Sequence, residues 1–215
     1  MDGAEARWSG GRTGVQRLLT SSDCASIIIL CLDLFPFEKP TDKEPSNRMR
    51  PIRAAVVTVS DTAYSGQRKD VSGPLLCNLV GELGADLVRR VIVPDERDKI
   101  VALLVNLTDA MALDLVLTTG GTGLTPRDVT PEATRAVIRR EVPGLAEVLR
   151  FQGYRHTEMA VISRGVVGVR GRTLIINLPG NPKAVQQGME TLAPILPHAV
   201  QMIRGEDTDH DDVVR

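Results

Sequence analysis

Strand-like and helix-like segments alternate along the chain from Arg53 onward, and this alternation constrains the fold more than any other feature. The β-branched run Ala54–Val59 precedes a stretch of helical periodicity, and the strand-like segment Asp86–Val93 comes next. Asp114–Thr119 and Thr173–Leu178 are apolar runs that suit the centre of a parallel sheet. We therefore expect an α/β fold: a three-layer domain with a mostly parallel central sheet and right-handed crossovers.

Apolar residues three or four positions apart indicate helices between these strands. One helix is expected around Leu75–Leu83 and a second around Ile100–Leu107. A third is expected to begin at Thr130, with the threonine capping its first turn and the proline after it in the first helical position. Near the C-terminus, a long amphipathic stretch should be interrupted or kinked by two prolines, Pro194 and Pro197.

The first 48 residues differ from the rest of the chain. Their one apolar run, Ala25–Phe37, is too short to span a bilayer, and a polar stretch follows it. We interpret residues 1–48 as a poorly ordered extension and Met49 as a functional start; a targeting segment is the alternative, although no small-residue cleavage site follows the run. The predicted domain covers residues 49–205, and residues 206–215 form an acidic tail that we expect to be hydrated.

Charge and composition disfavour several functional classes. The 26 Lys and Arg nearly balance the 27 Asp and Glu, so no overall field attracts the chain to nucleic acid or to an anionic membrane. Aromatic residues make up only 3%, which disfavours a surface on which bases stack. The cysteines lack a C-x-x-C spacing and suggest neither a disulfide framework nor a zinc site, so a reducing cytoplasm fits best: Cys24, Cys31 and Cys77.

Distinctive polar and glycine residues directly follow four of the predicted strands. Ligands of open α/β sheets bind outside the carboxyl ends of the strands, so these segments are the candidate site. The segments are Ser60-Asp61, Pro94-Asp95-Glu96, Thr118–Gly123 and Pro179–Lys183.

The glycine-rich segment Thr118–Gly123 could turn its backbone N–H groups inward as an anion nest. It matches neither a P-loop nor a dinucleotide fingerprint, and a tight turn is an equally good interpretation. Asp128 lies just beyond the glycines, where a carboxylate beside a phosphate needs a cation or a role in proton transfer. Mg²⁺ held by one or two carboxylates and by phosphate oxygens would satisfy this requirement.

The other segments each have two interpretations. Asp95 could project over the same edge as Asp128, but from spacing alone an aspartate after proline is more often a helix cap. Asn181 could cap a helix, contribute to an anion site at the helix N-terminus, or do both. One loop offers hydroxyl and guanidinium donors to a phosphate or carboxylate, unless it is simply a solvated basic loop: Ser163, Arg164, Arg170 and Arg172.

Together, these segments resemble the MogA/MoaB family of molybdenum cofactor biosynthesis and the G domain of gephyrin, over about residues 52–205. The matching motifs occur in the family's order: VTVSD (57–61), DVSG (70–73), VPDE (93–96), TTGGTG (118–123), PRDVTPE (126–132), SR (163–164) and LIINLPG (174–180). The resemblance implies a molybdopterin adenylyltransferase. Such a nucleotidyltransferase moves AMP from ATP to the terminal phosphate of molybdopterin and releases pyrophosphate, with Mg²⁺ as cofactor. It also implies a cytoplasmic homotrimer, with transient contacts to molybdopterin synthase and molybdenum insertase.

By the resemblance, the family's two functional aspartates correspond to Asp95 and Asp128, which are the catalytic candidates and the candidate Mg²⁺ ligands; which of them holds the metal stays open. Ser163 corresponds to the serine on the pterin side. The nucleotide and pterin pocket is assigned to Ser60, Asp61, Asp70, Gly73, Thr119, Gly120, Gly121, Thr122, Gly123, Ser163, Gly180, Asn181 and Pro182. A non-catalytic molybdopterin-binding or oligomerising module is the alternative, and the presence of both aspartates argues against it. The sequence does not separate a MogA role from a MoaB role.

Overall fold

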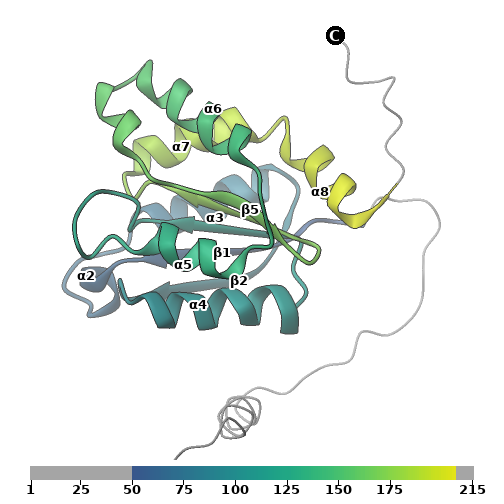
Figure 1. Ribbon diagram of the computed structural model, residues 1–215, viewed down its shortest axis with the longest axis horizontal. Coiled ribbons are helices and arrows are strands. Elements are labelled where there is room, and N and C mark those ends of the chain that lie inside the picture. The colour runs from purple at the N-terminus through teal and green to yellow at the C-terminus, as the bar shows by residue number, and fades with distance from the viewer. Residues whose placement is uncertain (1–49, 207–215) are drawn as a thin grey trace, which may run out of the picture. The chain divides into compact units, whose positions relative to one another are not determined.

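The computed structural model describes residues 50–206, and in this range six strands form one sheet in the order β2-β1-β3-β6-β5-β4 (Figure 1). Neighbours from β2 to β6 are parallel, while β5 is antiparallel to β6 and β4 to β5. The strands are β1 (Arg53–Val59), β2 (Asp86–Val93), β3 (Leu115–Thr119), β4 (Arg140–Glu141), β5 (Val167–Arg170) and β6 (Thr173–Leu178). The predicted mostly parallel sheet is confirmed. The sequence analysis missed β4 and β5, which are short.

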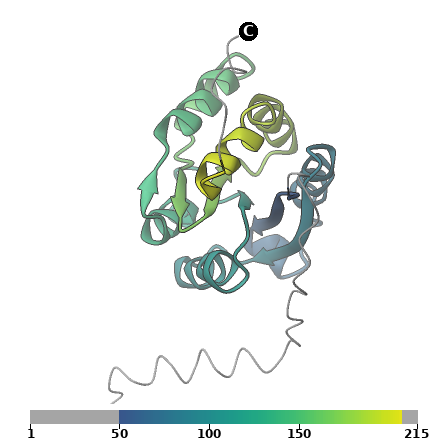
Figure 2. The same cartoon turned by 90° about the vertical axis from the view of Figure 1, so that its right-hand side faces the viewer.

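Helices cover both faces of this sheet, so the predicted three layers are present (Figure 2). On one face lie α3 (Ser72–Glu82), α6 (Pro143–Tyr154), α7 (Pro182–Leu192) and α8 (Leu196–Arg204). On the other lie α4 (Arg97–Val105), the π-helical turn η1 (Asn106–Ala110) and α5 (Thr130–Val137). Two short helices complete the described elements: α2 (Asp61–Tyr64) and the 3₁₀ helix η2 (Glu158–Ile162). The central strands β3 and β6 are buried along their whole length because both of their faces contact helices.

The helix ends confirm some sequence predictions and correct others. Asn181 caps α7, since its Oδ1 accepts a hydrogen bond from the Lys183 amide at 2.9 Å. The predicted interruption by prolines is confirmed, because α7 ends at Leu192 and α8 begins at Leu196. The predicted cap at Thr130 is wrong: this residue is the first of α5, and its hydroxyl donates instead to the Gly120 carbonyl at 3.0 Å.

The strand order places a crevice at the carboxyl ends of β1 and β3. The chain first places β2 on one side of β1, and it then returns to place β3 on the other side of β1. Such a reversal in strand order is where open α/β sheets bind ligands, because the two loops diverge there. The fold therefore brings Ser60 and the loop after Thr119 to the same crevice.

At the amino-terminal ends of the strands, opposite the crevice, a buried ion pair joins α8 to the residue before β3. Arg204 donates to Asp114 at 2.7 Å, and both side chains are only 2% exposed. The same guanidinium donates to the carbonyls of Arg50 and Pro51. No helix within residues 50–206 is long and apolar enough to cross a membrane. The extension 1–48 and residues 207–215 of the acidic tail lie outside the described residues, so the predictions about them remain predictions.

Candidate functional site

The glycine loop after β3 requires glycine at two consecutive positions. Gly120 and Gly121 have φ of +102° and +61°, in the region that side chains rarely adopt. A Cβ atom on Gly120 would lie 2.3 Å from the Val59 carbonyl oxygen, and one on Gly121 would lie 2.3 Å from Oγ1 of Thr130. The loop therefore packs directly against the end of β1 and the start of α5.

This loop forms a smaller anion nest than the sequence suggests. The Gly120 amide donates to the Leu178 carbonyl at 3.1 Å, so it is not available to a ligand. The amides of Gly121 and Thr122 donate to no other atom of residues 50–206. These two amides are the donors that a phosphate could reach.

Asp61 and Asp95 form a reciprocal pair across the ends of β1 and β2. The Asp95 carboxylate accepts from the Asp61 amide at 2.8 Å, and the Asp61 carboxylate accepts from the Asp95 amide at 3.0 Å. The cap interpretation of Asp95 is wrong, because Glu96 occupies the N-cap position of α4. Gly121 lies beside this pair: a Cβ atom on it would lie 3.1 Å from Oδ1 of Asp95.

Charges around this pair affect its two members differently. Arg127 donates to both carboxylate oxygens of Asp61 and, through these hydrogen bonds above all, holds the pKa of Asp61 below its usual value. Burial raises the pKa of Asp95, and the negative charges of Asp61 and Asp128 add to this shift. Asp95 is therefore the carboxylate of this group that gains most from a nearby cation.

Asp128 stands on the other side of the glycine loop. Its Oδ2 accepts from the Thr125 amide at 2.8 Å and lies 3.0 Å from the position of a Cβ atom on Gly123. Burial acts to raise the pKa of Asp128, but the neighbouring Thr125 and Gly123 donors outweigh burial and hold that pKa below its usual value. Asp128 is thus ionised at neutral pH.

The donor chemistry of these carboxylates suits Mg²⁺. Residues 50–206 contain no group of three His, Cys, Asp or Glu side chains arranged to hold a metal on their own. Mg²⁺ commonly binds one or two carboxylates and completes its shell with water and substrate phosphates. Asp95 and Asp128 supply two carboxylates beside the loop, and the pKa of Asp95 is raised by burial first and by the negative charges of Asp61 and Asp128 second, so a bound cation would favour its ionised form.

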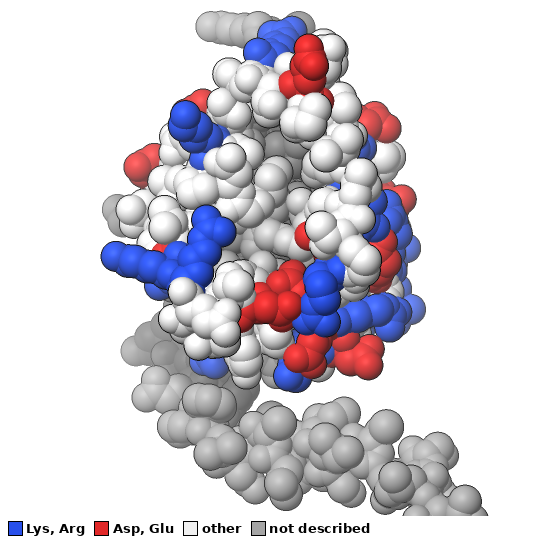
Figure 3. All heavy atoms as spheres, turned by 90° about the vertical axis from the view of Figure 1, so that its left-hand side faces the viewer, with Lys and Arg blue, Asp and Glu red and all other residues white. Residues whose placement is uncertain are grey.

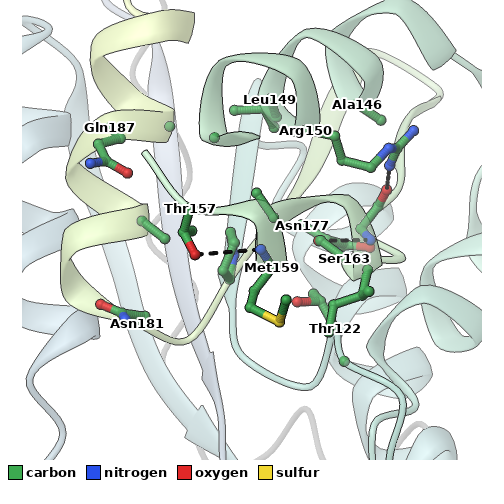
Figure 4. Close-up of a pocket in the computed structure, with 18 of the residues that line it drawn as sticks. Thr122, Ala146, Leu149, Arg150, Thr157, Met159, Ser163, Asn177, Asn181 and Gln187 are labelled. Atoms are coloured by element: carbon green, nitrogen blue, oxygen red, sulfur yellow. Dashed lines mark hydrogen bonds between the residues drawn. The ribbon is translucent and has the colours of Figure 1, made fainter. Parts of the chain in front are cut away.

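Two cavities flank the glycine loop. The first, of about 450 Å³, lies at the ends of β1 and β3, and we call it the switch-point cavity; its walls include Ser60, Arg68, Lys69 and Gly120. The second, of about 270 Å³, is the Ser163 cavity, between α6, α7 and η2 (Figure 4). Asn181 lines both, so the cavities are neighbours.

The Ser163 cavity has an apolar wall and a few polar groups. In Figure 4, Thr122 and Ser163 lie on one side of it, and Gln187 of α7 and the cap residue Asn181 lie on the other. Arg150 donates to the Gly165 carbonyl at 3.1 Å, which keeps its guanidinium at the cavity rim. Such a mainly apolar cavity with a few polar groups suits a flat organic ring system. Figure 3 shows this side of the molecule: acidic and basic side chains adjoin near its lower part, beside a hollow of uncharged residues.

The structure divides the predicted site residues among these features. The switch-point cavity is lined by Ser60, Asp70, Thr119, Gly120, Gly180, Asn181 and Pro182. The Ser163 cavity is lined by Thr122, Gly123, Ser163 and Asn181. Asp61, Asp95, Gly121 and Asp128 line neither cavity and instead form the cluster beside the loop.

Asp70 and Gly73 have a structural explanation. The Asp70 carboxylate accepts hydrogen bonds at 2.9 Å each from the Thr58 hydroxyl, the Gly73 amide and Arg90. A Cβ atom on Gly73 would lie 2.3 Å from Oδ2 of Asp70, so only glycine permits this bonding. Both residues therefore hold the start of α3 against β1, and their assignment to ligand binding stays a prediction.

Sequence reasoning misjudged several basic residues. Arg68 and Lys69 line the switch-point cavity, yet a polar loop with two cations carries no recognisable signal. Of the two interpretations of Arg170 and Arg172, the structure does not support ligand donors: Arg170 binds Asp109 at 2.8 Å, and Arg172 binds the Arg204 carbonyl at 3.0 Å. Both guanidiniums therefore bond to protein acceptors.

Comparison with known proteins gives consistent results. The family model described as a probable molybdopterin binding domain matches residues 55–198. The molybdopterin adenylyltransferase of Helicobacter pylori strain J99 is 39% identical over 159 residues, which are 73% of this chain and 90% of that protein. The Drosophila melanogaster molybdenum cofactor synthesis protein cinnamon is 46% identical over 160 residues, which are 74% of this chain but only 26% of that protein. A crystal structure of the molybdopterin biosynthesis enzyme MoaB from Thermus thermophilus superposes with a TM-score of 0.69 at 47% identity, covering 72% of this chain and 98% of that one.

Proposed function

Since the chain belongs to the family described as a probable molybdopterin binding domain, we propose that it is a molybdopterin adenylyltransferase of molybdenum cofactor biosynthesis. The match covers 90% of the Helicobacter relative of that name, which supports a nucleotidyltransferase. The reaction transfers AMP from ATP to the terminal phosphate of molybdopterin and releases pyrophosphate.

The observation that carries this proposal is the position of the glycine loop between two cavities. Gly120 lines the switch-point cavity, whereas Thr122 and Gly123 line the Ser163 cavity. Gly121, between them in the chain, adjoins Asp95. A transferase that joins two substrates needs two binding sites that meet at the reacting atoms, and the loop provides such a meeting point.

We assign the nucleotide to the switch-point cavity and the pterin to the Ser163 cavity. Arg68 and Lys69 give the first cavity two cations for a triphosphate. The second combines an apolar wall with the hydroxyls of Thr122 and Ser163, which suits a pterin ring with polar edges. The terminal phosphate of molybdopterin would then approach the α-phosphorus of ATP beside Gly121.

The chain's own groups can supply what this reaction requires. An oxygen of the pterin phosphate forms a bond to the α-phosphorus, and the bond from that phosphorus to the bridging oxygen of pyrophosphate breaks. The free amides of Gly121 and Thr122 would stabilise the negative charge that develops on the equatorial oxygens. Asp95 and Asp128 would hold Mg²⁺, which when bound neutralises phosphate charge and orients the two substrates. Phosphoryl-type transfer depends on positioning and electrostatics, so no covalent intermediate is needed.

Assembly and location are further parts of the proposal. By resemblance to the family, we expect a homotrimer in the cytoplasm, with transient contacts to molybdopterin synthase and molybdenum insertase. Large apolar side chains exposed on α6 and η2 offer a surface that an oligomer would cover: Phe151, Tyr154, Met159 and Val161. Analytical ultracentrifugation of the full chain measures the oligomeric state directly.

The test is to incubate the purified protein with molybdopterin, ATP and Mg²⁺ and to follow pyrophosphate release together with the adenylylated product. Asp95→Ala and Asp128→Asn should each lower turnover by about 100-fold or more, because charge neutralisation at the α-phosphate is lost while no core packing changes.

Asp98→Asn is the matched control, since this α4 carboxylate is 96% exposed. Its turnover should equal that of the wild type. Near-native turnover in both site variants would remove Asp95 and Asp128 from the mechanism. Binding of both ligands without pyrophosphate release would instead indicate a non-catalytic binding module.

A further inference from the structure

Arg164 connects three parts of the candidate site through one side chain. Its Nε donates to the Gly123 carbonyl at 2.7 Å, and its Nη2 donates to the Asp128 carbonyl at 2.6 Å. Its Nη1 forms an ion pair with Glu132 of α5. The guanidinium therefore holds both ends of the segment 123–128, which carries the Asp128 carboxylate.

The main chain of Arg164 strengthens this connection. Its amide donates to the Thr122 carbonyl at 2.9 Å, so the residue also holds the glycine loop just before the segment. Ser163, directly before it in the chain, lines the Ser163 cavity. A substrate that orders Ser163 would thus order the residue that holds Asp128.

The segment 123–128 has few other attachments. Leu124 is 65% exposed and contributes nothing to the core. Arg127 attaches the segment to Asp61 through hydrogen bonds to both carboxylate oxygens, in an ion pair that is open to solvent. The Asp128 carboxylate bonds within the segment, to the Thr125 amide. Among the described residues, Arg164 is thus the side chain that holds both ends of the segment from outside.

Glu132 explains why an arginine stands at this position. The Glu132 side chain is 42% exposed, but its Oε2 is buried without a hydrogen-bond partner, and its other oxygen pairs with Arg164. The planar guanidinium presents N–H groups in several fixed directions and can reach two carbonyls and a carboxylate at once. A lysine ammonium keeps the charge but is a compact group at the end of a flexible chain.

We propose, resting on the function proposed above, that Arg164 is a positioning residue for adenylyl transfer. It holds the backbone at Gly123 and at Asp128, so that the Asp128 carboxylate lies against the glycine loop. Because Ser163 precedes it in the chain, Arg164 also connects the Ser163 cavity with the segment that carries Asp128. The three side-chain hydrogen bonds of Arg164 all end on protein acceptors, so the guanidinium acts through this segment and not on a reacting atom.

The test compares four variants in the full chain. Arg164→Lys keeps the charge, and Arg164→Met removes it. The double variant R164M with E132Q removes both charges of the ion pair, so no carboxylate is left without its partner. Arg170→Lys is the matched control, because Arg170 also joins a carboxylate, Asp109, to a main-chain carbonyl, that of Val137, but away from the site.

The measurements are kcat and KM for each substrate, the melting temperature, and hydrogen exchange of the Thr125 amide. Arg164→Lys should lower kcat at least about tenfold with the KM for ATP nearly unchanged, since a misplaced catalytic group slows the chemical step. Exchange of the Thr125 amide should accelerate in every Arg164 variant. Arg170→Lys should change neither kcat nor this exchange.

The double variant separates positioning from stability. We expect it to regain melting temperature relative to Arg164→Met while its kcat stays low. If turnover recovers together with the melting temperature, Arg164 only stabilises the fold and the proposal is overturned. Unchanged exchange at Thr125 in the Arg164 variants would overturn it as well. An inactive wild type would contradict the proposed function alone, because the exchange measurement does not depend on turnover.

Discussion

A methyl group at position 121 tests how tightly the glycine loop is packed. Gly121 has φ of +61°, where an L side chain costs about 1–2 kcal/mol of conformational energy. The added Cβ would also lie 2.3 Å from Oγ1 of Thr130, a fully buried residue. This hydroxyl donates to the Gly120 carbonyl, so moving it breaks a buried hydrogen bond, at a cost of about 1–3 kcal/mol in the free energy of unfolding.

We therefore expect Gly121→Ala to lower the free energy of unfolding by about 2–5 kcal/mol. Gly171→Ala is the matched control, because Gly171 also has a positive φ, +56°, but nothing lies within 4 Å of the added methyl group. The control should cost only the conformational part, about 1–2 kcal/mol. The difference between the two variants isolates the contact with Thr130.

Urea denaturation followed by circular dichroism measures both values, with the midpoint read at an unchanged slope. Gly121→Ala should also reduce adenylyl transfer at temperatures where it is fully folded, since the methyl group would lie 3.1 Å from Oδ1 of Asp95. Equal destabilisation of the two variants would refute the reasoning, because the contact with Thr130 would then carry no cost. Full activity of folded Gly121→Ala would show that the contact between the loop and Asp95 does not affect adenylyl transfer.

Three further predictions concern other parts of the chain. Ser163→Ala should weaken molybdopterin binding more than ATP binding, by about 1–2 kcal/mol for one hydroxyl hydrogen bond, as ligand titrations would show; the reverse order would place Ser163 on the nucleotide side. Asp114→Asn should destabilise the domain by about 3–5 kcal/mol at pH 7, because it leaves the buried Arg204 unbalanced. Burial acts to raise the pKa of Asp114, but Arg204 and the Arg53 amide outweigh burial and lower that pKa. The ion pair therefore stabilises the wild type above the pKa of an unfolded aspartate, about 3.9, and this stabilisation is lost as the pH falls below that value. Acid unfolding curves should therefore converge for the two proteins, and a constant gap between them would contradict the assignment. A chain that begins at Met49 should match the full chain in melting temperature and turnover, since the described core lies within residues 54–200; a melting temperature many degrees lower would show that the extension is structural.

Local patterns in the sequence were enough to predict the central architecture. The predicted strand Thr173–Leu178 matches β6, and Asp86–Val93 matches β2, because alternation between apolar runs and helical periodicity depends on neighbouring residues. The position of Asp95, Asp128 and the glycines near the strand ends follows from the same reading, since parallel strands bring their carboxyl ends to one edge. The short strands lack such a pattern and depend on tertiary pairing, β5 with β6 and β4 with β5.

The partners of the site residues were decided only by the tertiary structure. Spacing favours a cap role for Asp95, yet the folded chain pairs it with the amide of Asp61, 34 residues away. The side chain of Arg164 bonds to residues 32 to 41 positions away, so its sequence neighbours do not indicate these bonds. A local pattern shows which side chains can form hydrogen bonds. Which partners they bond to depends on the groups that the fold brings together away from water. Burial acts to raise the pKa of both Asp95 and Asp128, and the two values shift in opposite directions because the Thr125 and Gly123 donors outweigh burial at Asp128.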